Sequence, residues 1–183
     1  MDLFLRDAEK LALRFCALVQ EHLVEDALSA AEAGDTTATQ VSALRYIARH
    51  VPAHVGEMSF GLAISPPAAT KTVDRLVQKG LVDRREDPED RRQHLLTLTE
   101  TGEALLSRVK DEQALRLGEI LDRMTEGDRK AFVKGLRGFM TAAFMTENAL
   151  VTRTCERCGS DCFESCIINQ AHLALYHQAI QPV

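Results

Sequence analysis

Apolar residues recur at helical spacing along the first thirty positions of the chain. Phe4, Leu11 and Phe15 fall on one side of such a helix, and charged residues separate them. A period of about 3.6 residues predicts one amphipathic helix here. The stretch Ala33-Gly34-Asp35 then interrupts the pattern, so the helix is expected to end before it.

Two capping patterns mark the starts of the next main helices. Thr37 followed three residues later by Gln40 fits a capping box, and Ser65-Pro66 combines an N-cap with a proline at the first helical position. A short helix from Val55 to about Leu62 is expected between them. The expected buried positions of the two capped helices are Val41, Leu44, Ile47, Ala48, Ala69, Val73, Leu76 and Val77.

A β-hairpin is expected after Lys79-Gly80, which supplies a helix stop. The segment Leu81–Arg85 and the segment from Arg91 to Leu98 flank a polar turn that contains Pro88, which is typical of two short strands with an exposed tip. Two helices follow, beginning near Thr99 and Thr125, and a short one is expected from Ile167 to about Ala179.

This order of elements predicts a mainly α (α+β) fold, a winged helix-turn-helix with extra helices at both ends. The expected division is 1–36 for an N-terminal helix, 37–100 for the winged helix-turn-helix, 101–150 for C-terminal helices and 151–183 for a cysteine-rich tail. A helix of this kind fits the major groove of duplex DNA, and an arginine at a hairpin tip suits the negative minor groove. We expect Arg91 at the tip, with Asp87 or Asp90 holding the turn by an ion pair.

Charge neither supports nor excludes a nucleic-acid partner. The formal net charge is −5, yet residues 65–92 carry seven basic and six acidic side chains. Because DNA responds to the local field of the docking face, net charge is a weak test. Any single lysine or arginine is more simply explained as a solvated surface residue; the combination of a capped helix with a charged hairpin favours DNA binding.

The motifs in this region resemble those of the MarR family of regulators. Residues Ser65–Leu76 are similar to its recognition helix, Gly80–Arg92 to its wing, and Leu98–Gly102 to the junction into a long helix that supports the dimer. The resemblance implies a homodimer, built from the N- and C-terminal helices, that binds a palindromic operator, with repression as the commoner mode. Gly61 and the cysteine-rich tail depart from the family pattern. The residues expected to contact DNA are Ser65, Pro67, Ala68, Thr70, Lys71, Arg75, Arg84, Arg91 and Arg92.

Four cysteines in the tail have the spacing of a metal site. Cys155, Cys158, Cys162 and Cys166 follow the pattern C-x2-C-x3-C-x3-C, and four nearby thiolates suit a tetrahedral zinc ion or an iron–sulfur cluster. Spacing alone does not separate the two; we favour the cluster, with zinc as the alternative. Cys16, in the first helix, is interpreted as a core residue rather than a redox-active thiol.

These features favour a redox- or iron–sulfur-responsive regulator over two alternatives. One is a repressor that responds to a small apolar effector and carries a structural zinc site; the other is a small thiol or cluster redox protein. The sequence contains no glycine-rich phosphate loop, nucleophile elbow or His-Glu-x-x-His motif, so no enzyme is expected. No signal peptide or membrane span is evident, which predicts a cytoplasmic protein without a membrane partner.

Overall fold

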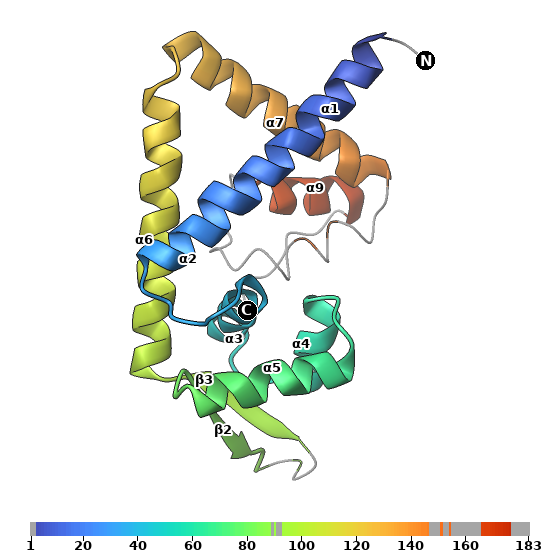
Figure 1. The fold of residues 1–183 in the computed structure, drawn as a ribbon. Coiled ribbons are helices and arrows are strands. Elements are labelled where there is room, and N and C mark those ends of the chain that lie inside the picture. The colour runs from blue at the N-terminus through green and yellow to red at the C-terminus, as the bar shows by residue number, and fades with distance from the viewer. Residues whose placement is uncertain are drawn as a thin grey trace.

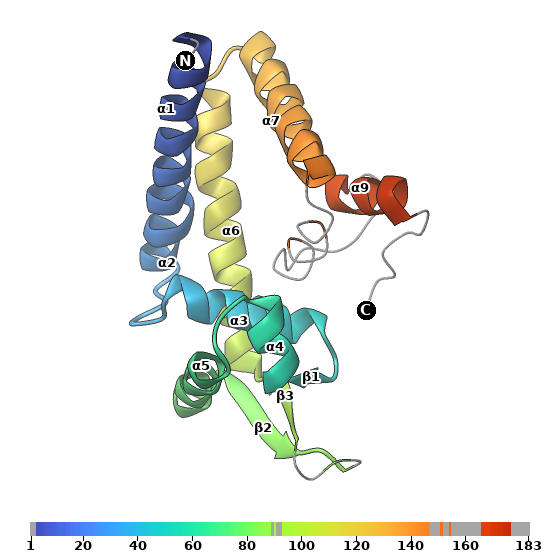
Figure 2. The ribbon, with the colours of Figure 1, turned by 90° about the vertical axis from the view of Figure 1, so that its right-hand side faces the viewer.

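The computed structural model of the chain describes residues 3–88, 90, 93–146, 151, 154 and 166–176. A helical arm at the N-terminus comprises α1 (Leu3–Leu18), η1 (Val19–Glu25) and α2 (Asp26–Ala30). The η1 and α2 parts of this arm pack against the long helix α6 (Glu100–Asp122), whereas α1 diverges from α6 (Figure 1). Below them lies a small winged-helix body whose hairpin projects away from the arm (Figures 1 and 2).

Residues 3–30 are helical as expected, but the helix is not uniform. Its η1 stretch is π-helical, which widens the backbone spiral locally and weakens the regular carbonyl pairing. Gln113 of α6 donates its Nε2 proton to the Leu23 carbonyl at 2.7 Å, and its Oε1 accepts a hydrogen bond from Arg45. A long-range contact therefore accompanies the π-helical turns.

The winged-helix body contains three helices and a three-stranded antiparallel sheet. Its helices are α3 (Ala38–Arg49), α4 (Val55–Gly61) and α5 (Pro66–Gln78), and its strands are β1 (Ala53–His54), β2 (Val82–Glu86) and β3 (His94–Leu98). The strand order is β1-β3-β2. Leu96 of the central strand β3 lies opposite Ala53 of β1 on one side and opposite Arg84 of β2 on the other. The hairpin and the helices were expected; the short strand β1 was not.

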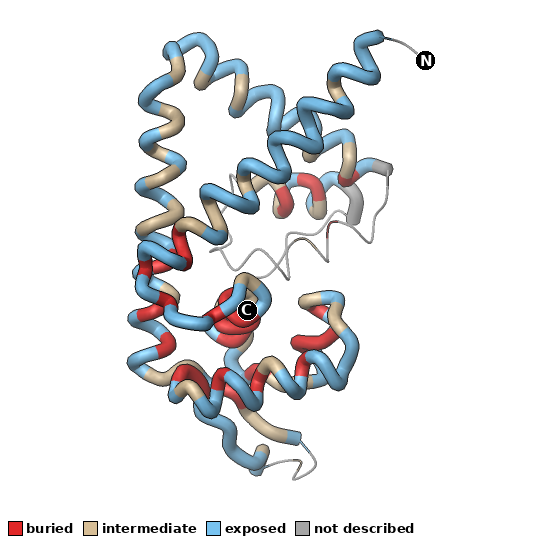
Figure 3. The backbone as a smooth tube through the Cα atoms, viewed as in Figure 1, coloured by how far each residue is buried: buried red, intermediate tan, exposed pale blue. Residues whose placement is uncertain are grey.

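The hydrophobic core lies inside this body, where α3, α5, the sheet and the start of α6 meet. Figure 3 shows the buried positions concentrated there, while the arms are mostly exposed. Two expected core positions were wrong: Ala48 and Val77 are exposed. Tyr46, on the neighbouring side of α3, is buried instead, because the core surrounds α3 more widely than a single stripe.

The C-terminal helices form a second, smaller unit. Helix α7 (Glu126–Thr146) leaves the far end of α6 and diverges from it, and α9 (Ile167–Tyr176) packs against the end of α7 (Figure 2). Phe144, Val151, Ile168 and Ala171 are buried together there. Throughout the described ranges, the helices are too short or too polar to cross a bilayer.

Candidate nucleic-acid interface

Helix α5 is fixed at its start by the predicted cap. The Ser65 hydroxyl accepts a hydrogen bond from the Ala68 amide at 3.3 Å, and the two prolines that follow occupy the first helical positions. Ala69, Val73 and Leu76 are fully buried. These contacts hold one side of α5 on the core and leave the opposite side open.

The open side of α5 carries most of the side chains expected to contact DNA. Pro67, Ala68, Thr70, Lys71 and Arg75 are all exposed. The Thr70 hydroxyl donates to the Pro66 carbonyl within the helix at 3.1 Å, which still leaves its oxygen able to accept a hydrogen bond. The structure therefore brings these five positions together on one accessible helix face.

Lys79 ties the end of α5 to the loop that precedes α3. Its ammonium group donates to Gln40 Oε1 at 3.0 Å and pairs with Asp35 at 2.8 Å. This lysine lowers the pKa of the Asp35 carboxyl by hydrogen bonding and by its charge. Gln40 also accepts the Thr37 amide as half of the predicted capping box, so one buried amide side chain orients both helices.

Arg84 joins the hairpin to α5. Its Nη1 donates to Asp74 Oδ1 at 3.0 Å, and 30% of its side chain remains accessible. The pair sets the position of β2 relative to the helix face that carries Lys71 and Arg75. The predicted contact between Arg84 and DNA stays a prediction.

The hairpin tip is closed by backbone and side-chain hydrogen bonds. The Gln93 amide donates to the Asp90 carbonyl at 2.8 Å, and the Gln93 side chain donates to the Asp90 carboxylate at 3.1 Å. Asp90 thus takes part in the turn through hydrogen bonds to Gln93. Arg91 and Arg92 lie outside the described residues, so the predicted ion pair and tip contact remain predictions.

Asp87 reaches a partner that the sequence did not indicate. Its Oδ2 lies 3.0 Å from His54 Nε2, and His54 Nδ1 lies 3.5 Å from Glu57 Oε2. The hydrogen bond to Asp87 raises the pKa of His54, and Glu57 adds to the effect. A separation of 33 residues and the absence of any motif around His54 explain why sequence reasoning gave this histidine no function.

The helical arms present apolar side chains without a core beneath them. Helix α1 has no buried residue, and exposed apolar side chains lie on both α1 and α7. They include Phe4, Leu11, Leu18, Val133 and Phe139. Cys16 is also exposed, which corrects its interpretation as a core residue; α1 packs on no core within the single chain.

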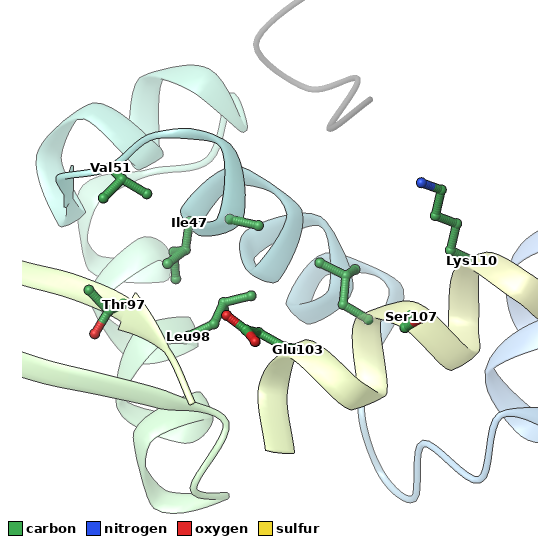
Figure 4. A pocket seen from close by; sticks show the side chains of 9 residues that line it. Ile47, Val51, Thr97, Leu98, Glu103, Ser107 and Lys110 are labelled. Carbon is green, nitrogen blue, oxygen red and sulfur yellow. The ribbon is translucent and has the colours of Figure 1, made fainter. Parts of the chain in front are cut away.

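A cavity of about 460 Å³ lies between α3, β3 and α6. Ile47 and Val51 line it from α3 and the segment after it, Leu98 from β3, and Glu103 and Lys110 from α6 (Figure 4). The cavity lining thus combines apolar side chains with two charged ones, both of them from α6. Of the four tail cysteines, the structure describes Cys166, which is half-buried before α9; Cys155, Cys158 and Cys162 lie outside the described residues.

An exposed capped helix beside a charged hairpin defines a winged helix-turn-helix protein. Residues 35–93 match the sequence model of the MarR family, and a MarR family protein from Bacillus stearothermophilus superposes with a TM-score of 0.67 at 24% identity, covering 80% of this chain and 99% of that one. This segment is therefore similar to the MarR family, and its fold is a winged helix, as the motifs indicated.

Two further proteins are similar over most of the chain. The HTH-type transcriptional repressor MdtR of Bacillus subtilis is 29% identical over 125 residues, 68% of this chain and 70% of MdtR. FabT of Streptococcus pneumoniae, solved in complex with DNA, superposes with a TM-score of 0.63 at 22% identity. The superposition covers 79% of this chain and 99% of the FabT chain. The first curated relatives are matched over less than two thirds of their length, 65% for one and 42% for another. The curated relatives are named as HTH-type transcriptional regulators, and MdtR among them as a repressor.

Proposed function

We propose that the chain is a homodimeric, DNA-binding transcriptional repressor that docks α5 in the major groove of a palindromic operator. The observation that carries the proposal is the open face of α5, where Lys71 and Arg75 stand exposed beside a hairpin anchored through Arg84. Phosphates attract such a face, and base edges can be read from it. MdtR is named as a repressor and FabT was solved with DNA, which supports the same function here.

Binding to DNA can be tested without knowing the operator. The full chain is used to enrich a duplex from a pool of random sequences, and its affinity for that duplex is measured by fluorescence anisotropy at several salt concentrations. If each protomer neutralises about four phosphates, the logarithm of the affinity should fall against the logarithm of salt with a slope of about −7. A failure to enrich any duplex would contradict the proposed function.

Arg75→Ala and Arg129→Ala form a matched pair for this test. Arg75 lies on the open face of α5, whereas Arg129 is on α7, where it pairs with Asp122 at 3.6 Å. We expect Arg75→Ala to weaken binding by about fivefold or more, since an arginine contact to a base is worth about 1–3 kcal/mol. The Arg129 variant should bind as the wild type does, and an equal loss in both would count against α5 as the docking helix.

The cysteine-rich tail is proposed to hold a metal centre through Cys155, Cys158, Cys162 and Cys166. Its support is the donor set, because four thiolates within so short a segment suit an iron–sulfur cluster or zinc. A redox-sensitive cluster favours a sensing role for the tail, and α9 would link the centre to α7. Anaerobic purification tests the choice: brown protein with stoichiometric iron and sulfide supports the cluster, and colourless protein with stoichiometric zinc supports the alternative. Protein without either metal would refute the centre.

The cavity beside Leu98 favours a second candidate, a repressor that responds to a small effector. The cavity touches α3, β3 and α6, so a ligand there could alter the angle between the winged-helix body and the arms. Leu98→Trp would fill the space. If an effector works through this cavity, the variant should keep DNA binding and lose its response to that compound in a ligand screen.

A further inference from the structure

His54 occupies a helix-capping position without capping the helix. It is the N-cap residue of α4, with extended backbone angles, yet its side chain makes no cap hydrogen bond. Serine, threonine, aspartate and asparagine are the usual residues there, because their oxygen accepts a free helical amide. The imidazole of His54 instead contacts two carboxylates, Glu57 within α4 and Asp87 outside it.

The imidazole joins the winged-helix body to the hairpin. It lies between two carboxylates, with Asp87 on Nε2 at 3.0 Å and Glu57 on Nδ1 at 3.5 Å. His54 and Asp87 are well shielded from water, with side chains 16% and 14% exposed. Glu57 belongs to α4 itself, whereas Asp87 follows β2, so only the bond to Asp87 crosses from one element to the other.

This junction lies beside the face proposed to meet DNA. A cavity of about 300 Å³ separates the start of α4 from the hairpin, and Thr70 of α5 borders it. Among the described residues, the charged and titratable groups that face His54 across this corner are Glu57 of α4, Asp87 after β2, Arg84 of β2 and His94 of β3.

We propose that the His54–Asp87 bond is a proton-dependent latch that holds the hairpin in position for DNA, so that protonation of His54 strengthens DNA binding. The proposal rests on the proposed function and names a positioning residue for it. His54 acts through Asp87 and the hairpin.

The sign of the effect follows from the charges. With a protonated imidazole the bond to Asp87 is charge-assisted and roughly twice as strong as a neutral one. The two carboxylates raise the pKa of His54, so the latch is fully present below the ordinary histidine value of about 6.5 and is lost as pH rises through the raised value. A hairpin that is already held in place loses less conformational entropy when it binds DNA. The negative potential of DNA also stabilises the protonated imidazole of His54. DNA binding should therefore take up a proton and weaken as pH rises.

The test compares affinity across pH at constant salt, using the duplex enriched by the full chain. From pH 6.5 to 8.5 we expect the wild-type Kd to rise on the order of tenfold, the equivalent of one pKa unit between free and bound protein. His54→Gln keeps a hydrogen-bonding side chain but cannot titrate, and Asp87→Asn removes the anchoring charge. Both variants should bind more weakly at pH 6.5 and show a nearly flat profile.

His22→Gln is the matched control, because His22 pairs with Asp26 at 2.8 Å far from the hairpin. It should retain the wild-type profile. A profile in His54→Gln as steep as the wild type's would overturn the latch while leaving the proposed function intact, whereas a wild type that binds no duplex at any pH would remove both. If the variants do not fold, NMR titration of His54 in the wild type decides: a higher titration midpoint with duplex than without supports the latch, and an equal midpoint overturns it.

Discussion

At the scale of single residues, two glycines of α6 differ in what surrounds them. A Cβ at Gly102 would lie 2.1 Å from the Leu81 carbonyl oxygen, because the first turn of α6 packs directly on the backbone that follows α5. At Gly118 nothing lies within 4 Å. We expect Gly102→Ala to lower the free energy of unfolding by about 2 kcal/mol through overpacking, as measured by urea denaturation.

Gly118→Ala serves as the control in the same helix. Alanine favours a helix over glycine by about 1 kcal/mol, so this variant should be as stable as the wild type or more so. Equal destabilisation in both variants would show that helix α6 itself, rather than its contact with Leu81, is sensitive to substitution.

Two lysines of the α5 region are expected to separate stability from DNA binding. Lys79 donates to the buried Gln40, whereas Lys71 stands on the open face of α5. Lys79→Met keeps the aliphatic stem and removes a charged hydrogen bond, which should lower the free energy of unfolding by about 1.5 kcal/mol. Urea denaturation measures this loss.

Lys71→Met should reduce DNA binding and leave stability nearly unchanged. Its stability is expected to stay within about 0.5 kcal/mol of the wild type, while its affinity for the enriched duplex falls. A loss of stability from Lys71→Met with no loss of affinity would mean that this face of α5 packs against protein.

At the scale of the elements, the parts that could be predicted are those set by neighbouring residues. Thr37 with Gln40, and Ser65 with Pro66, identified the starts of α3 and α5 because a cap is made within four residues. The hairpin was also predictable from its polar turn. The face of α5 proposed to bind DNA followed directly, since burying Ala69, Val73 and Leu76 leaves Lys71 and Arg75 outside.

The parts that could not be predicted depend on residues distant in the chain. Strand β1 has two residues, and its pairing with Leu95 and Leu96 of β3 defines it. The π-helical turns of η1 bond to Gln113, 90 residues away from Leu23, and His54 reaches Asp87 across the body. Helical periodicity likewise placed Ala48 on the same face as Val41 and Leu44, but Ala48 lies near the end of α3, where it lines the cavity beside Leu98 and stays exposed.

The helix α9 is expected to be held by a cluster that is separate from the main core. Ile168 is 5% exposed in that cluster, whereas Leu173 on the same helix is 49% exposed. Ile168→Asp would bury an unpaired charge and release α9 from α7. Hydrogen exchange should then show loss of amide protection in α9 while protection in α3 and α5 is kept. Leu173→Asp should leave α9 protected, and a loss of protection throughout the protein would contradict the separation of the two clusters.

At the scale of the whole molecule, the arms carry exposed apolar side chains that fit the proposed dimer. Helix α1 buries no residue within the chain, and within the described part of α7 the side chain of Phe139 is 69% exposed. Many exposed apolar side chains on neighbouring helices are typical of an interface, and the proposed two-fold dimer would use the same arms from each chain. Replacing Phe139 with glutamate should therefore shift the protein from dimer to monomer in sedimentation equilibrium, because a charge would enter the apolar interface.

Phe60→Glu is the matched control for Phe139→Glu. Phe60 is also 69% exposed, but it lies on α4 in the winged-helix body. The same change there should leave the dimer intact, since α4 lies apart from the arms (Figure 1). A palindromic operator needs two recognition helices fixed relative to each other, so Phe139→Glu should also lose affinity for the enriched duplex. A monomer that still binds with wild-type affinity would mean that each winged-helix body recognises DNA alone.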